Sequence, residues 1–124
     1  SPEIVDAIRM VSSTFNLTGI AEAAAIAALK EPEYTQFILD KNAEERARVV
    51  QGLQDMGYQP MQSVTNFVSC DIGRPAADIV TAMRSRSVRI STVGGDEFNN
   101  YIRLSMGTPE STDAFLKEIK EVLN

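Results

Sequence analysis

Tyr101-Ile102-Arg103-Leu104-Ser105-Met106-Gly107-Thr108-Pro109-Glu110 is the stretch of sequence that decides the fold. Apolar and polar residues alternate up to Met106, which is the period of a β-strand with one buried face. The three residues after Gly107 form a helix start, with a capping hydroxyl, a proline at the first helical position and an acid in the first turn. Because the apolar face must be buried, we expect Arg103 to point away from the core.

The residues around this strand predict a β-α-β-β-α unit. Residues 66–72 alternate with Val68, Cys70 and Ile72 on one face, which predicts a strand. A helix is expected over 75–86, followed by a short strand formed by Val88 and Ile90, and then a turn at 94–96. With the helix from 109 onward, this order indicates an α+β fold (an α/β layer), in which helices cover a small, mostly antiparallel sheet.

The first part of the chain predicts helices only. One starts at Ser1-Pro2-Glu3 and ends at Ser12-Ser13-Thr14, a second runs over 18–30, and a long third helix opens at Pro32 and stops at Gly57. We therefore expect a helical segment over 1–57, which forms an arm, and a small domain over 58–124. Together they are expected to make one globular unit, whose arm packs on a further partner.

Composition excludes several classes of function. The net charge of -5 argues against nucleic acid as the main partner, and no apolar run approaches the roughly 20 residues of a membrane helix. The absence of histidine removes Ser-His-Asp and Cys-His catalysis and the commonest zinc ligand. A single cysteine and no visible signal peptide lead us to expect a cytoplasmic protein.

Arg103 is the best candidate binding residue, because a guanidinium presents a planar fork that matches a carboxylate. The alternative is an ordinary exposed arginine on a solvated sheet face. Asn66, which opens the first strand, is a second candidate, with local turn capping as the alternative.

Other conspicuous residues favour structural roles. Gly94-Gly95 lacks the lysine and spacing of a phosphate loop, so a turn is the simpler interpretation. Cys70 is expected on a buried face, as a small apolar residue and not a nucleophile. Glu44 and Glu45 are expected on a solvated helix face that forms no metal site.

Three segments together resemble the fold-type I, pyridoxal-phosphate-dependent aminotransferases, specifically the histidinol-phosphate aminotransferase branch. They are Phe15-Asn16-Leu17 followed by the alanine-rich run 21–29, then Thr65-Asn66-Phe67-Val68, and the segment 102–110. The resemblance covers essentially all 124 residues. It implies the C-terminal small domain of a homodimeric enzyme, whose cofactor shuttles an amino group between an amino acid and a 2-oxo acid.

The resemblance also implies roles for individual residues. The arginine matching Arg103 binds the α-carboxylate of the substrate. Many relatives carry a further arginine where this chain has Ser91, so Arg89, two residues earlier, is expected to substitute for it.

Part of the aminotransferase machinery has no match in this sequence. None of the four lysines lies in the Ser/Thr-rich turn that carries the family's Schiff-base lysine. We therefore expect no catalytic residue, no bound pyridoxal phosphate and no activity in this chain alone. Substrate binding would then also need a large domain that this sequence does not contain, either as part of the same polypeptide or as a separate chain that assembles with it. The alternative from another class is a non-catalytic α+β binding or regulatory module.

Overall fold

The computed structural model describes residues 1–12 and 17–123 and divides into two compact units, Ser1–Phe37 and Ile38–Asn124. The expected helix breaker at Ser13 and Thr14, and the Phe15-Asn16 part of the first family segment, lie outside the described residues.

The first unit is helical. It contains α1 (Pro2–Val11), α2 (Gly19–Leu29) and the beginning of α3 (Pro32–Asp55). The hydroxyl of Thr18 caps α2 by accepting a hydrogen bond from the backbone N–H of Ala21 at 3.2 Å. No described residue of α1 or α2 is buried, so the apolar side chains of both helices, among them Ile4, Ile8 and Ile20, are exposed.

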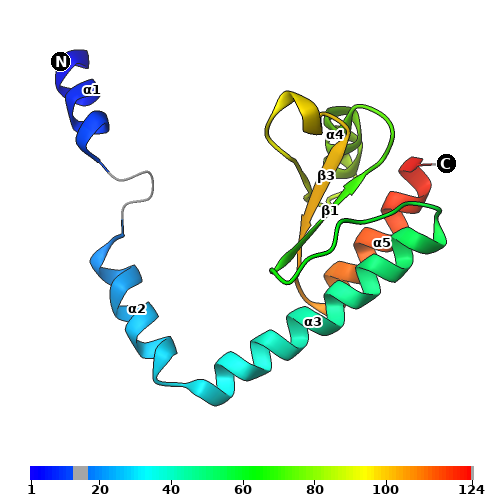
Figure 1. The fold of residues 1–124 in the computed structure, drawn as a ribbon, viewed down its shortest axis with the longest axis horizontal. Helices are drawn as coiled ribbons and strands as arrows, with labels where there is room; N and C mark the ends of the chain where they lie inside the picture. Colours follow the sequence, from blue (N-terminus) through cyan, green and yellow to red (C-terminus); the bar gives the residue numbers. More distant parts are fainter. Residues whose placement is uncertain (13–16, 124) are drawn as a thin grey trace. The chain divides into compact units, whose positions relative to one another are not determined.

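The second unit contains a three-stranded antiparallel sheet in the order β1-β3-β2. Figure 1 shows two of its strands, β1 and β3, side by side. Its strands are β1 (Phe67–Asp71), β2 (Ser91–Thr92) and β3 (Tyr101–Ser105). The central strand β3 is therefore the one that carries Arg103. The α+β class and the antiparallel sheet expected from the sequence are confirmed.

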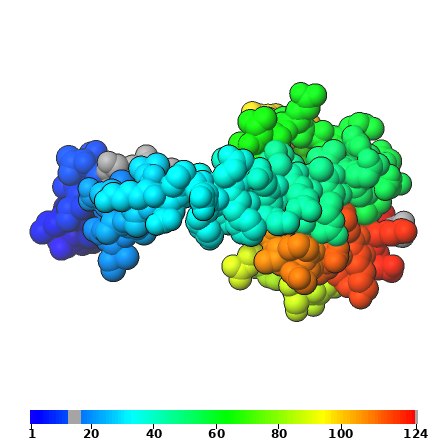
Figure 2. Space-filling model, turned by 90° about the horizontal axis from the view of Figure 1, so that it is seen from below, coloured from blue at the N-terminus to red at the C-terminus, as the bar shows by residue number. Residues whose placement is uncertain are grey.

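Helices α4 (Ala76–Ser85) and α5 (Pro109–Leu123), together with the end of α3, cover one face of this sheet. Figure 2 shows the green surface of α3 directly beside the orange and red surface of α5. Their side chains meet in one core, to which the sheet contributes Val68, Cys70 and Ile102, and the helices contribute Val49, Leu53, Ile79, Met83, Phe115 and Ile119. Because Ile102 faces this core, the next residue, Arg103, faces the side of the sheet without helices.

The short strand lies later than the sequence predicted. Val88 and Ile90 precede β2, which is formed by Ser91 and Thr92. The chain leaves α4 through Ser87, which has a φ of 64°, and the backbone N–H of Val88 bonds back to the carbonyl of Met83 at 3.0 Å. This tight helix end delays the pairing with β3 until Ser91.

The expected solvated position of Glu45 is wrong. Glu45 is 2% exposed, because Glu45, Val49 and Leu53 follow one another at four-residue intervals on the buried face of α3. The carboxylate of Glu45 accepts a hydrogen bond from the guanidinium of Arg48 at 2.8 Å, and Arg48 also pairs with Asp113 of α5. Glu44 is exposed, as expected, and pairs with Lys41 at 2.7 Å.

The compact units divide inside α3, because the later part of this helix packs in the core of the second unit. The sequence-based division at residue 57 assigned all of α3 to the helical arm, whereas Val49 and Leu53 belong to the core of the second unit. The expectation that both segments form one globular unit stays a prediction.

Candidate functional site

Arg103 lies in the middle of the central strand with small neighbours on both sides. Its Cα pairs with Ser69 of β1 and with Ser91 of β2. Two serines flanking an arginine leave its guanidinium uncovered, and the Arg103 side chain is exposed. The guanidinium carbon lies 4.9 Å from the centre of the Phe67 ring, so a cation–π contact holds this side chain against β1.

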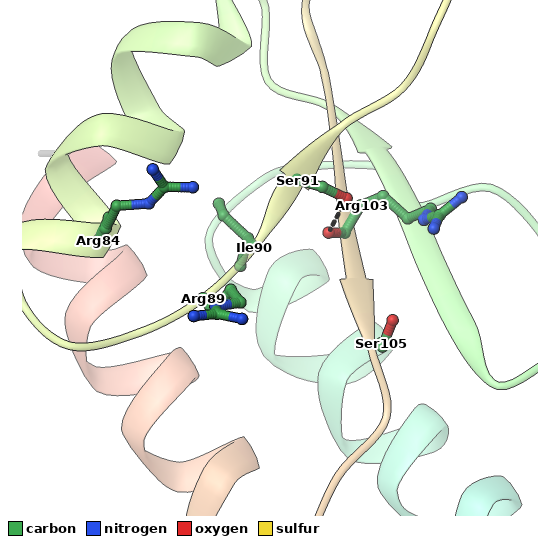
Figure 3. Close-up of a pocket in the computed structure, with 6 residues that line it drawn as sticks. All are labelled: Arg84, Arg89, Ile90, Ser91, Arg103 and Ser105. Atoms are coloured by element: carbon green, nitrogen blue, oxygen red, sulfur yellow. Dashed lines mark hydrogen bonds between the residues drawn. The ribbon is translucent and has the colours of Figure 1, made fainter. Parts of the chain in front are cut away.

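A pocket of about 630 Å³ lies between this strand and the end of α4. Six residues line it: Arg84, Arg89, Ile90, Ser91, Arg103 and Ser105. Figure 3 shows Arg84 extending from α4 and Arg89 lying beside Ile90, while the guanidinium of Arg103 is on the opposite side of β3. The hydroxyl of Ser91 donates a hydrogen bond to the carbonyl oxygen of Arg103 at 3.4 Å, which ties β2 to β3 at the centre of the pocket.

The charges of the lining residues favour an anion over a cation. Three of the six carry a permanent positive charge, two carry hydroxyl groups, and none carries a carboxylate. Guanidinium groups bind carboxylates and phosphates through two parallel hydrogen bonds, and hydroxyl groups can add further donors.

The structure brings two of the three sequence-predicted binding residues together. Arg89 lines the same pocket as Arg103, although it precedes β2 and is not part of a strand. Asn66 is not among the lining residues of this pocket. Its backbone carbonyl instead accepts a hydrogen bond from the N–H of Met106 at 2.8 Å, which continues the pairing of β1 with β3.

The Gly94-Gly95 pair and Cys70 have the structural roles expected from the sequence. Gly95 has a φ of 100° and precedes a single 3-10 turn, Asp96–Phe98, so the Gly-Gly pair forms a turn. Cys70 is 1% exposed, and burial, reinforced by the charge of Asp71, raises the pKa of its thiol to about 11. A thiol with so high a pKa is a poor nucleophile at neutral pH.

Arg84 and Phe67 are the site residues that the sequence did not single out. Arg84 belongs to a group of three arginines, at positions 84, 86 and 89. The sequence shows that they are close together, but the directions of their side chains depend on how α4 ends. Phe67 precedes the buried Val68 on β1, and its contact with Arg103 depends on the register of β1 against β3.

The described residues do not fit pyridoxal phosphate. Its Schiff-base lysine needs a lowered pKa, whereas a hydrogen bond from Lys41 to Glu44 raises the pKa of Lys41. Lys30, Lys117 and Lys120 are exposed on helices or at a helix end.

The family model for aminotransferase class I and II matches residues 1–119. The chain therefore belongs to the class I and II aminotransferase family. Among curated relatives, histidinol-phosphate aminotransferase 2 of Methylococcus capsulatus is 31% identical over 121 residues, covering 98% of this chain and 33% of the relative. Histidinol-phosphate aminotransferase 2 of Haemophilus influenzae is 30% identical over 123 residues, covering 99% of this chain and 34% of the relative.

Solved structures agree with this assignment. A histidinol-phosphate aminotransferase from Sinorhizobium meliloti, solved in complex with pyridoxal 5'-phosphate, superposes with a TM-score of 0.77 at 31% identity and covers 98% of this chain and 34% of that one. An aminotransferase structure from Burkholderia pseudomallei has the same fold, with a TM-score of 0.76 at 23% identity over the whole chain and 38% of that protein. The chain thus spans about a third of the length of these relatives. Across the described residues, no helix has the length and apolar character to cross a membrane.

Proposed function

We propose that this chain supplies the substrate-binding small domain of a pyridoxal-phosphate-dependent aminotransferase of the histidinol-phosphate type. In this proposal Arg103 binds the α-carboxylate of the amino acid or 2-oxo acid. The observation that carries it is the position of Arg103, whose guanidinium lies on the open face of the sheet between two serines and next to a pocket without carboxylates.

The remaining machinery is proposed to lie outside this chain. The curated relatives are about three times as long, and the lysines described here are unsuited to a Schiff base. We propose that a large domain holds the cofactor and its lysine, and that the complete enzyme is a cytoplasmic homodimer. This chain alone would then transfer no amino group.

The exposed apolar side chains of the first unit support this proposal. Leu29 is 85% exposed, and Tyr34 and Phe37 are more than half exposed. Helices that expose this many apolar side chains are typical of surfaces covered by another part of a protein. We propose that the large domain covers these apolar side chains.

The test uses the complete enzyme that contains this chain. Replacing Arg103 with glutamine removes a charged, bidentate contact worth about 3 kcal/mol, so kcat/KM for amino-acid donors should fall roughly 100-fold. The matched control is Arg86→Gln, because Arg86 is engaged with Glu118 on α5, away from the pocket. Equal kcat/KM values for the Arg103 variant and the unmodified enzyme would refute the proposal.

A further inference from the structure

We propose that a groove between the ends of α3 and α5 binds a small amphipathic anion, a molecule with an apolar body and one carboxylate. This inference goes beyond the proposed function and does not depend on it. The groove has a volume of about 590 Å³, which lies within the range of small-molecule sites. None of its lining residues lines the Arg103 pocket, and α3 and α5 cover the face of the sheet opposite the Arg103 side chain.

The floor of this groove is apolar. It is formed by Met56, Tyr58, Leu116 and Leu123, which are partly buried and pack against the core of the second unit. The backbone N–H of Tyr58 bonds back to the carbonyl of Leu53 at 3.0 Å, which holds the residues that follow α3 against the end of the helix. The floor is therefore in place without a ligand, and binding costs little ordering of the protein.

Gly52 keeps the floor of the groove low. It lies on α3 against the Leu116 side chain of α5, and a Cβ at this position would be 2.4 Å from Leu116 Cδ2. Atoms do not approach each other so closely, so any larger residue would push the Leu116 side chain away from α3. Because both residues line the groove, the missing side chain at position 52 creates part of its space.

Two lysines of α5 line the groove on the other side. Lys117 and Lys120 are three residues apart, so they lie on the same side of the helix, and both are exposed. Lys117 lies 3.4 Å from Glu118, which also pairs with Arg86 at 2.8 Å. Among the described residues, Lys120 has no hydrogen-bond or ion-pair partner. Its ammonium group is available to an anion, while the methylene groups of its side chain can lie along the apolar floor.

The charges around the groove also orient the ligand. Asp55 lines the α3 side, where its carboxylate accepts a hydrogen bond from Gln51 at 2.7 Å and repels a second carboxylate. At the end of α5, the guanidinium of Arg74 donates to the carbonyl of Val122 at 2.7 Å, and its positive charge offsets the negative end of the helix dipole. The carboxylate of the ligand is therefore favoured beside the lysines, with its apolar body directed across the floor toward α3.

Isothermal titration calorimetry on the complete protein that contains this chain tests the inference. The probe is 4-phenylbutyrate, and the comparisons are 4-phenylbutan-1-ol, which lacks the charge, and acetate, which lacks the apolar body. The probe should bind at least roughly tenfold more tightly than either, because it alone contacts both the floor and the lysines. The Arg103→Gln variant is titrated in parallel and should bind the probe in the groove with unchanged affinity.

Charge variants assign the binding to the two lysines. Lys117→Gln combined with Lys120→Gln should weaken the binding of 4-phenylbutyrate about tenfold and leave the binding of the alcohol unchanged. The control combines Lys30→Gln with Lys41→Gln, which changes the net charge equally at exposed positions outside the groove. This control should keep the affinity of the unmodified protein.

A glycine variant tests the shape of the floor. Gly52→Ala should weaken 4-phenylbutyrate and the alcohol alike, by about fivefold, because the displaced Leu116 side chain takes up space in the groove. Gly94→Ala is the control, since an added Cβ there meets nothing within 4 Å. Circular dichroism of both variants shows whether they are folded, and the lysine variants test the inference whatever the result for Gly52→Ala.

Two results would overturn this inference. One is equal affinity for 4-phenylbutyrate and its alcohol, or a control pair of lysine variants that weakens binding as much as the pair in the groove. The other is loss of binding in Arg103→Gln while the Lys117 and Lys120 variant binds normally, which would place the probe in the substrate pocket. Neither result bears on the proposed function, because the two pockets share no lining residue.

Discussion

Removing the core anchor beneath the site strand should destabilise the second unit strongly. Ile102 is 2% exposed and lies in β3 next to Arg103, paired with Cys70 on β1 and Thr92 on β2. Ile102→Ala removes nearly all of a buried side chain and leaves a cavity, so the free energy of unfolding should fall by about 3 kcal/mol. Ile102→Val removes one methylene from the same place and should cost about 1 kcal/mol.

Urea denaturation followed by circular dichroism measures both changes, with Val64→Ala as the control, because Val64 is 93% exposed. The magnitudes follow from burial alone, so the order Ile102→Ala, Ile102→Val, Val64→Ala should hold. A cost below about 1 kcal/mol for Ile102→Ala, or an equal cost for Val64→Ala, would contradict the assignment of Ile102 to the core and with it the outward direction of Arg103.

Three further predictions concern other parts of the second unit. The folded pKa of Cys70, about 11, lies above its unfolded value of about 9, so the unfolded thiol ionises first. Stability should therefore be full below pH 9 and fall between pH 9 and about 11, and Cys70→Ala should remove this slope in denaturation measured across that range. Gly57 has a φ of 89°, so Gly57→Ala should lower the unfolding free energy by about 1 kcal/mol in the same assay, whereas Gly94→Ala should cost less. In the complete enzyme, Phe67→Leu removes the ring under Arg103 and should raise KM for amino-acid donors about threefold, and an unchanged KM would contradict a positioning role for the ring.

The alternation of apolar residues predicted most of the sheet, because it depends only on which face is buried. It placed Ile102 inside and Arg103 outside, and it located both β1 and β3. The same reasoning failed at β2, where Val88 and Ile90 alternate as a strand would. The backbone of Ser87 adopts a left-handed conformation that ends α4, so the residues at this helix end are not free to pair with β3. The pattern of hydrophobic residues in the sequence does not reveal this backbone constraint.

Polar residues whose partners are distant in the sequence were the least predictable. Glu45 is buried because α3 turns this side of the helix toward the core, and Arg48 reaches both Glu45 and Asp113, which is 65 residues away. Arg103 was predictable as a candidate from the alternation of its strand, whereas Arg89 was a candidate only through the resemblance to the aminotransferases. The inclusion of Arg84 depends on the packing of α4 beside β2, which only the three-dimensional fold provides.

The recognition of the substrate carboxylate by Arg103 is the central claim, and a comparison of matched donors tests it most directly. The complete enzyme and its Arg103→Gln variant would be assayed with an amino acid and with the amine that lacks only its α-carboxylate. The unmodified enzyme should favour the amino acid by roughly 100-fold in kcat/KM, and the variant should lose most of this preference while its activity toward the amine changes little. A preference of the same size in both proteins would show that another residue binds the carboxylate.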